Sequence, residues 1–245
     1  VDTMRYLINF SYLGRNFSGS QKQKDLRTVQ GEIEKVLTNI NNNYVKVTLA
    51  GRTDAKVNAL GQKAHFDLDK TISCHKLKGA LNSYLNDDIY INDVLIVKES
   101  FHARYMVKQK TYEYKINMGI YNPLFKDFIY QYCKKLNIKK MKKAIKYFVG
   151  NHDFTLFSSA SDKRIDKRRI ITHASLKKHK DIITITFKAK GFLKYQVRAM
   201  AGALIKLGEE NSDPKLIKDM LCGKISKKIC YVAPACGLTL TDIKY

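Results

Sequence analysis

The residues best suited to chemistry lie in a short turn that follows a β-branched run. Gly51 ends that run, and Arg52 and Asp54 follow it in a stretch with almost no other acid. A carboxylate beside a cation stays ionised and can act as a nucleophile or a base. Taken alone, the pair also fits a structural turn, because an Asp side chain commonly hydrogen-bonds its own backbone.

The histidines and cysteines offer no comparable arrangement. His75, His173 and His179 lack the spacing of a metal site, and His65 and His152 stand beside phenylalanines as structural residues do. The chain has no C-x-x-C pair, and its five cysteines, an odd number, argue against a disulfide framework. We therefore expect no bound metal and a reducing compartment.

The charge of the chain indicates its partner. Its 245 residues carry 45 Lys and Arg against 22 Asp and Glu, a formal net charge of +23. A surface of this kind attracts a polyanion and gains free energy when counterions are released from phosphates. A lysine-rich proteome explains the lysines but not the scarcity of acids, so a nucleic-acid partner is favoured.

The elements that must position the turn follow a recognisable order. Residues 5–12 alternate as a strand, and Thr28 is placed to cap a helix whose apolar residues recur at helical spacing. A strand over 44–50 and a loop over 51–58 come next. After them we expect a strand over 61–68, a helix capped by Ser73, and a strand over 89–97. This β-α-β-β-α-β order is the ferredoxin-like pattern.

The second half of the chain repeats the mixture of strands and helices. The predicted elements are a strand over 110–118, a helix over 138–149, a hairpin of strands 170–177 and 182–189, a helix over 194–207, a short helix after Pro214 and a strand over 238–243. The predicted class is α+β, in two halves, 4–107 and 108–245. Residues 1–3 precede Met4, which we expect to be the native start. No signal peptide and no membrane span are expected.

Motifs spread along the whole chain raise the Asp54 turn above its structural interpretation. They are Phe101-His102-Ala103-Arg104, Lys110-Thr111-Tyr112-Glu113-Tyr114, Asn151-His152-Asp153-Phe154, Val197-Arg198, Ala233-Pro234-Ala235 and Gly237-Leu238. Together with the turn, and in this order, they resemble the tRNA pseudouridine synthase A family from the first strand to the last residue. Each motif alone is weak evidence, whereas their combination is specific.

The resemblance implies a fold and an activity. The fold has two tandem ferredoxin-like halves that form a long mixed, mainly antiparallel sheet with a central catalytic cleft. The activity is isomerisation of uridine to pseudouridine in tRNA, at positions 38, 39 and 40 of the anticodon stem-loop, without a metal or an organic cofactor. Asp54 matches the essential aspartate of the family. Three routes stay open for its carboxylate: attack on C1′, attack on C6, or removal of the C2′ proton.

The resemblance also assigns partners to Asp54. Tyr112 matches a tyrosine that stacks on the target base and can remove the C5 proton, and Arg198 matches an arginine that pairs with the aspartate. Leu238 matches the apolar residue that closes the pocket. Arg52 matches an arginine beside the nucleophile, which we expect to serve base flipping and RNA binding. As ordinary residues, Tyr112 and Leu238 are core residues of strands and Arg198 is a helix-surface cation.

The chain departs from the family at three positions. Lys56 and Asn58 stand where the family usually has Gly and His, and Ser20 stands where it usually has Trp. If position 56 needs a positive φ, a lysine there costs roughly 1 kcal/mol or more. Lys56 also brings a cation close to Asp54, and we expect it to contact a phosphate. The missing Trp predicts a looser core unless neighbours fill the space.

Two other functions stay open at this point. A catalytically impaired RNA-binding protein or tRNA chaperone would keep the fold, and Lys56 is the one hint of it. A basic ribosome-associated α+β protein is compatible with the charge but not with the motifs. The resemblance further implies a cytoplasmic homodimer that binds tRNA through shape and phosphates rather than base edges.

Overall fold

The computed structural model describes residues 3–226 and 230–245 and divides into two compact units. Unit 1 comprises Val1–Lys108 with Leu240–Tyr245, and unit 2 comprises Gln109–Thr239. The predicted halves differ from these units at the C-terminus, where 240–245 belong to unit 1. The reason is hydrogen bonding: Lys108 donates its backbone N–H to the Lys244 carbonyl, and the Tyr245 hydroxyl donates to the Ala103 carbonyl at 2.8 Å. Of the three residues expected to precede the native start, 1 and 2 lie outside the described residues.

Unit 1 confirms the β-α-β-β-α-β order. Its elements are β1 (Met4–Tyr12), α1 (Val29–Asn41), β2 (Thr48–Leu49), β3 (Asn58–Leu68), α2 (Cys74–Tyr84) and β4 (Ile89–Ile96). The strands run in the order β4-β1-β3, with the C-terminal strand β10 (Leu238–Lys244) beside β3. β1 pairs antiparallel with both of its neighbours.

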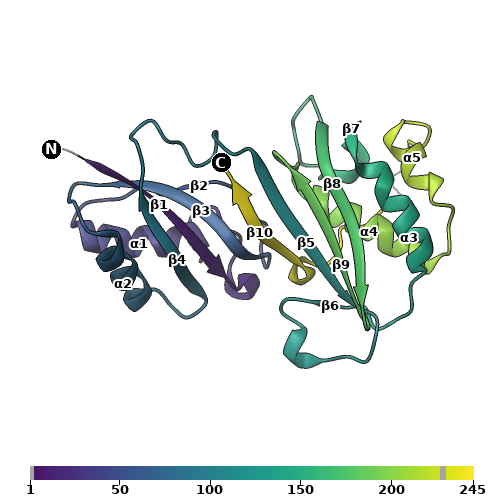
Figure 1. Ribbon diagram of the computed structural model, residues 1–245, viewed down its shortest axis with the longest axis horizontal. Coiled ribbons are helices and arrows are strands. Elements are labelled where there is room, and N and C mark those ends of the chain that lie inside the picture. The colour runs from purple at the N-terminus through teal and green to yellow at the C-terminus, as the bar shows by residue number, and fades with distance from the viewer. Residues whose placement is uncertain (1–2, 227–229) are drawn as a thin grey trace. The chain divides into compact units, whose positions relative to one another are not determined.

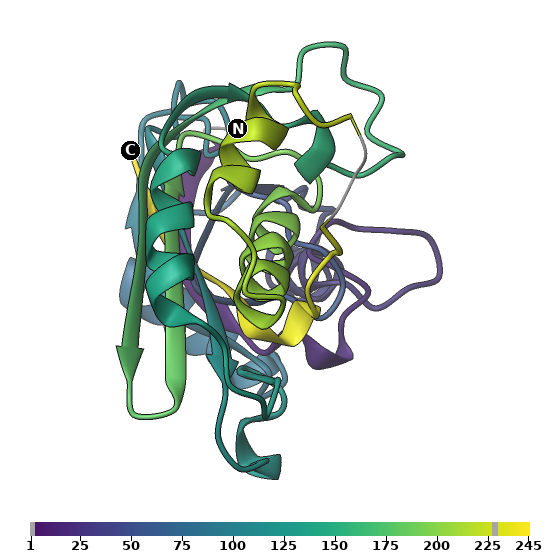
Figure 2. The same ribbon diagram turned by 90° about the vertical axis from the view of Figure 1, so that its right-hand side faces the viewer.

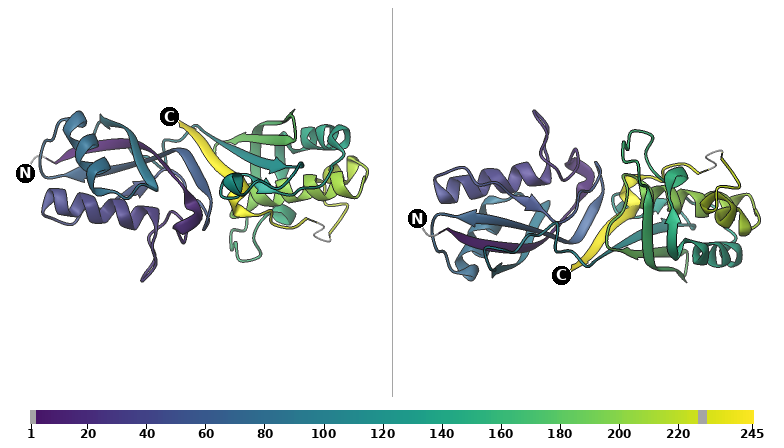
Figure 3. Two further views of the ribbon diagram at one scale, coloured as in Figure 1. Left: turned by 90° about the horizontal axis from the view of Figure 1, so that it is seen from below. Right: turned by 90° about the horizontal axis from the view of Figure 1, so that it is seen from above.

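The core of unit 1 follows from strand alternation and one amphipathic helix. Tyr6, Ile8, Phe10 and Tyr12 of β1 are buried, as the alternation predicts. α1 begins where expected, because the Thr28 hydroxyl accepts a hydrogen bond from the Gly31 N–H. Its apolar residues are buried, and both views of Figure 3 show α1 lying along the strands of this unit.

Two predictions in unit 1 were wrong in detail. The strand expected over 44–50 shortens to β2, because side chains of α1 take the backbone donors that a strand would use. The Val45 N–H donates to the Thr38 hydroxyl, and the Val47 N–H donates to the Glu34 carboxylate at 3.0 Å. Ser73 stands at the N-cap of α2, but its side chain makes no capping hydrogen bond.

Unit 2 contains the second set of strands and the remaining helices. Its elements are β5 (Gln109–Asn117), β6 (Tyr130–Gln131), α3 (Ile138–Ala144), β7 (Gly150–Asp153), β8 (Arg168–His179), β9 (Ile182–Ala189), α4 (Gln196–Glu209) and α5 (Lys215–Leu221). The strand order is β5-β9-β8-β7, and β6 pairs parallel with β5. Figure 2 shows α3 in front of the β8–β9 hairpin with α4 beside it.

The helix expected over 138–149 is shorter than predicted. α3 ends at Ala144 and continues as a 3₁₀ turn, Ile145–Phe148, in which Ile145 and Phe148 are buried. The amphipathic pattern therefore marks a buried face correctly but not the helix type. The short strand β7 was not predicted, since its four residues carry no alternation of apolar side chains.

The α+β class is confirmed, with strand pairs that are mainly antiparallel in each unit (Figure 1). A long sheet with a central catalytic cleft stays a prediction. No helix in the described part of the chain is long and apolar enough to cross a membrane.

Candidate functional site

The carboxylate of Asp54 stands at the start of a tight turn in unit 1. The Val57 N–H donates to the Asp54 carbonyl at 3.2 Å, which closes the turn, and Lys56 has φ +65°. Positive φ at the third residue is the pattern of a type II turn, where glycine is normally preferred. Position 56 thus has the positive φ on which the conformational cost of a lysine there depends. The Lys56 N–H donates to the Phe17 carbonyl at 3.3 Å, so the turn is also tied to the loop before α1.

Thr53, immediately before Asp54, is buried, and its N–H, carbonyl and hydroxyl groups all form hydrogen bonds. Its N–H donates to the Ser20 hydroxyl at 2.8 Å, and its carbonyl accepts from the Ser20 N–H at 3.1 Å. Its own hydroxyl bonds the Tyr12 hydroxyl at 2.7 Å. With backbone and side chain both fixed, Thr53 sets the position from which Asp54 projects.

A buried glutamine fixes the segment that leads into the turn, at Gly51. The Gln62 amide donates to the Gly51 carbonyl at 2.8 Å and accepts from the Gly51 N–H at 3.3 Å. Gln62 is fully buried, and the nearby Tyr12 side chain is buried as well. Burial raises the pKa of the Tyr12 hydroxyl to about 12, so this hydroxyl stays protonated around neutral pH. We call Tyr12, Ser20, Thr53 and Gln62 the Thr53 network.

The loop before α1 packs closely against the turn. A Cβ added at Gly14 would lie 2.2 Å from the Val57 carbonyl oxygen, so only glycine fits there. The Gly14 N–H donates to the Asn58 side chain at 2.8 Å, in a buried position. Gly19 has φ +105° and lies against the Thr53 carbonyl, which again requires a residue without a side chain.

The three departures from the family pattern are accommodated differently. Asn58 is buried and supplies the acceptor for Gly14. Ser20 is completely buried and bonds the backbone of Thr53 on both sides. The missing Trp was expected to leave a looser core, but Ser20 instead ties this position to Thr53 by hydrogen bonds. Lys56 alone keeps a conformational cost.

The side chains of the turn face solvent to different degrees. Asp54 is half-buried, whereas Arg52 and Lys56 are exposed. A half-buried carboxylate with two exposed cations within two residues can reach a substrate, and the cations can reach phosphates. Arg52, Asp54 and Lys56 therefore lie together in the short segment 52–56.

The remaining predicted site residues lie in unit 2. Tyr112, on β5, is 7% exposed, and its ring meets the edge of Phe192 with centroids 5.3 Å apart and planes at 89°. β5 pairs with β9, where Phe187 stands opposite Tyr112. Tyr112 is thus fixed in the β5–β9 register and packs against the ring of Phe192.

Arg198 projects from the first turn of α4 and is half-buried. Its Nε donates to the Ala233 carbonyl at 2.7 Å, and the Ala233 N–H returns a bond to the Arg198 carbonyl at 3.1 Å. Its guanidinium lies 5.2 Å from the centre of the Tyr195 ring. These two hydrogen bonds fix Arg198 against the segment around Ala233, so Arg198 is not a loose surface cation.

The segment around Ala233 also lies in close backbone contact with α4. A Cβ at Gly202 would lie 2.0 Å from the Tyr231 carbonyl oxygen. One residue before Leu238, a Cβ at Gly237 would lie 2.7 Å from the ring of Tyr114, whose hydroxyl donates to the Pro234 carbonyl at 2.8 Å. Leu238 itself is buried at the start of β10.

Sequence reasoning missed the residues that support the site. Tyr12 and Gln62 were read only as parts of strands, and Ser20 only as a lost Trp. A polar residue at an inward position of a strand was the available signal for Gln62. Gln196 was also missed: it is fully buried and accepts from the Leu193 N–H at 2.8 Å just before α4.

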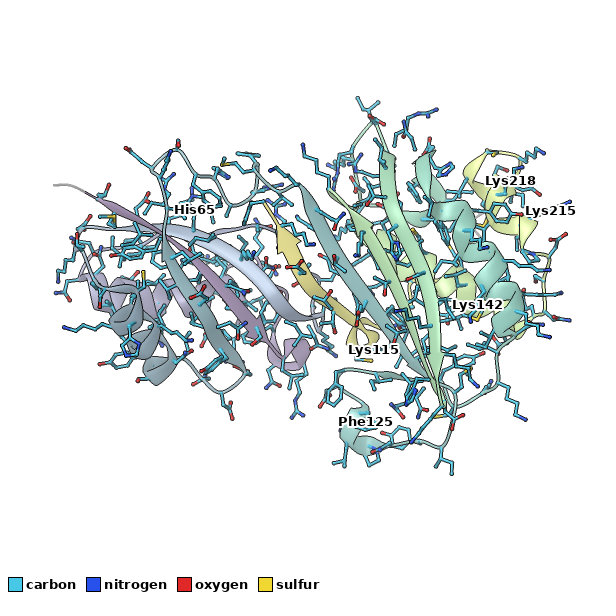
Figure 4. All side chains as sticks on the ribbon, viewed as in Figure 1. His65, Lys115, Phe125, Lys142, Lys215 and Lys218 are labelled. Carbon is cyan, nitrogen blue, oxygen red and sulfur yellow. The ribbon has the colours of Figure 1, made fainter. Side chains whose placement is uncertain are left out.

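His65 was expected to be structural, and this is confirmed. The buried imidazole accepts a hydrogen bond at Nδ1 from the Ala103 N–H at 3.0 Å (Figure 4). Burial, with smaller contributions from Arg5 and His102, lowers the pKa of His65 to about 4. Among the residues that the structure describes, no group of three His, Cys, Asp or Glu side chains could hold a metal ion.

The chain is similar in sequence to tRNA pseudouridine synthases. A family model described as tRNA pseudouridine synthase matches residues 8–106 and 144–245. A tRNA pseudouridine synthase A 1 of Bacillus cereus is 39% identical over 243 residues, which is 98% of each chain. The tRNA pseudouridine synthase A of Streptococcus pyogenes serotype M49 is 40% identical over 247 residues, 99% of each chain. A solved Cbf5-Nop10-Gar1 complex overlays with a TM-score of 0.40 and 12% identity, over 83% of this chain and 44% of that one.

Proposed function

The chain belongs to the tRNA pseudouridine synthase family, and on that premise we propose that Asp54, Tyr112 and Arg198 carry its reaction. The enzyme is an isomerase that converts uridine to pseudouridine in tRNA. In this reaction the N1–C1′ bond breaks, the base turns, and C5 joins C1′. N1 gains a proton and C5 loses one, so the reaction needs no redox partner.

Asp54 is the nucleophile or base of the proposal. The observation that carries it is the Thr53 network, which fixes the residue before Asp54 with buried hydrogen bonds and leaves the carboxylate half-exposed. A turn held this rigidly keeps a reacting group in one position, which lowers the cost of orienting it. Arg52 and Lys56 in the same turn favour the ionised carboxylate.

Tyr112 is proposed to stack on the target base and to accept or relay the C5 proton. Its ring is fixed by Phe192, and an aromatic face is a general means of holding an extruded base. Arg198 is proposed to pair with the aspartate, and the hydrogen bond from its Nε to the Ala233 carbonyl holds the guanidinium in place for that pairing. Leu238 is proposed to close the pocket on its apolar side.

The exposed cations of the turn are proposed to act on the RNA backbone. Arg52 serves base flipping and binding more than bond chemistry, and Lys56 contacts a phosphate. Both residues are exposed beside the carboxylate, which supports a role at the RNA surface. We further propose that the enzyme acts at positions 38, 39 and 40, as a homodimer in the cytoplasm.

Release of tritium tests the function directly. Wild-type protein incubated with a tRNA transcript that carries 5-tritiated uridine should release tritium to water, and the product should contain pseudouridine at 38, 39 or 40. Transcripts with uridine at only one of these positions assign the site. Release without pseudouridine, or pseudouridine only elsewhere in the tRNA, would contradict the proposal.

The impaired alternative predicts a different result from the same assay. A tRNA chaperone would bind the transcript tightly and release no tritium at any protein concentration. No observation on the described residues or the relatives favours this alternative.

Arg52→Ala separates binding from chemistry within the proposal, because it should weaken tRNA binding. Unchanged affinity together with unchanged turnover would refute the role of Arg52.

A further inference from the structure

A cavity of about 440 Å³ on unit 2 is lined mostly by lysine side chains. Lys140 and Lys143 come from α3, Lys146 from the 3₁₀ turn after it, and Lys215 from α5. We call these four residues and their cavity the lysine pocket. Figure 4 labels Lys142 on α3 and Lys215 and Lys218 on α5, the two helices that contribute to the pocket.

The helix face that builds the pocket places lysines close to one another. Lys140, Lys143 and Lys146 recur every three residues, opposite a buried stripe that includes Met141 and Ile145. Like charges at this spacing repel each other. α3 holds no acid to offset them. This concentration of charge does not stabilise the fold, whereas it would stabilise a bound polyanion.

The cations of the pocket are available for a ligand. Within residues 3–226 and 230–245, none of the four lysines forms an ion pair, and the ammonium of Lys140 bonds only the Asn211 carbonyl. The one acid at the pocket is Asp213, whose carboxylate accepts from the Lys215 N–H at 2.9 Å at the start of α5. Four positive charges against one negative charge leave a strong preference for anions.

The walls of the pocket suit a nucleotide strand better than a lone ion. Tyr147 and Pro214 contribute a half-buried ring and an apolar edge between the lysines. A ribose or base can pack against such surfaces while its flanking phosphates meet the ammonium groups. The lysines belong to three consecutive turns and a separate helix, so they reach more than one phosphate.

We infer that the lysine pocket is a binding site for the phosphodiester backbone of RNA, separate from the Asp54, Tyr112 and Arg198 residues. It rests on the proposed function for the identity of the RNA, which is the tRNA substrate. Its role is affinity and not chemistry, because none of its residues belongs to the proposed catalytic set.

The test compares two triple variants of the full chain. K143Q/K146Q/K215Q removes three exposed charges of the pocket. The matched control, K177Q/K178Q/K180Q, removes three exposed charges from the end of β8 and the turn that follows it. Binding of full-length tRNA is measured by fluorescence anisotropy between 50 and 200 mM salt, and tritium release is measured at saturating tRNA. Thermal melting checks that both variants fold.

The pocket variant should weaken tRNA binding roughly ten-fold or more at low salt. The slope of log Kd against log salt should fall by about 2, since each phosphate contact contributes about 0.7 to 0.9. The control should change both quantities much less, and both variants should release tritium at the wild-type rate when saturated.

Equal Kd and slope for the pocket variant and wild type would overturn the inference, and so would an equal loss in the control, which would indicate a general charge effect. A pocket variant that binds normally but turns over slowly would also overturn it. If wild-type protein binds tRNA through the pocket but releases no tritium, the pocket stands and the proposed function fails.

Discussion

The Asp54 turn of unit 1 and the Arg198 region of unit 2 are held in place by different forces. In unit 1, the buried side chains of Ser20 and Gln62 bond the backbone of Thr53 and Gly51, and the buried hydroxyls of Tyr12 and Thr53 bond each other. In unit 2, two hydrogen bonds join Arg198 to Ala233 and one joins Tyr114 to Pro234, and close backbone packing at Gly202 and Gly237 completes the region. Damage to the first region should come from an unpaired polar group, and damage to the second from a steric clash.

The largest effect is expected in unit 2, at Gly202. Gly202→Ala places a Cβ 2.0 Å from the Tyr231 carbonyl oxygen, and backbone on both sides limits relaxation. Overpacking of this kind costs about 3 kcal/mol, which lowers the melting temperature by roughly 6 to 12 °C. The melting temperature and the rate of tritium release should both fall.

Gly79→Ala is the matched control, because nothing lies within 4 Å of a Cβ at this α2 glycine. It should stabilise the protein by about 0.5 to 1 kcal/mol. If Gly202→Ala melts at the wild-type temperature, close packing does not hold the Arg198 region.

The next effect is expected in unit 1, at Ser20. Ser20→Ala leaves the buried Thr53 N–H without its acceptor, which costs about 1 to 2 kcal/mol. Because the change lies next to Asp54, kcat should fall more than tRNA affinity does. Chemical denaturation and single-turnover tritium release measure the two effects.

Ser18→Ala controls for the loop itself, because the Ser18 hydroxyl forms no hydrogen bond within the part of the chain that the structure describes. A Ser20→Ala enzyme as stable and active as Ser18→Ala would show that the Thr53 network does not position Asp54.

A smaller effect separates strain from charge at Lys56. Lys56→Gly removes both the positive-φ cost and the cation, whereas Lys56→Ala removes the cation alone. The glycine variant should be more stable than the alanine variant by about 1 kcal/mol. Both should flatten the salt dependence of tRNA binding equally. Unequal slopes, or an unchanged slope in both variants, would count against the phosphate contact.

The smallest effect is a pH dependence at His65. Its pKa is lowered to about 4. Between pH 6.5 and 4, His65 is therefore protonated in the unfolded chain but neutral in the folded chain. Stability linked to His65 is therefore complete above pH 6.5 and is lost as the pH falls toward 4. His65→Asn keeps an acceptor for Ala103 and removes the titration. Denaturation curves of this variant should depend less on pH over that interval, and identical pH profiles would contradict the assignment.

Local chemistry explains which parts were predictable from sequence. The Thr28 cap and the alternation of β1 depend on neighbours a few residues away, and both were predicted correctly. The strand over 44–50 failed because Thr38 and Glu34, on the preceding helix, compete for its backbone donors. Ser20, Tyr12 and Gln62 meet around the turn from positions up to 50 residues apart, and no local pattern encodes such a meeting.

The central claim is that the Asp54 carboxylate does the chemistry, and one isosteric substitution tests it. Asp54→Asn keeps the shape of the side chain and removes its charge, so the turn should stay folded. We expect tRNA affinity within a few-fold of wild type and no detectable tritium release in a single turnover. Release within ten-fold of the wild-type rate, from a variant that binds tRNA normally, would contradict the account.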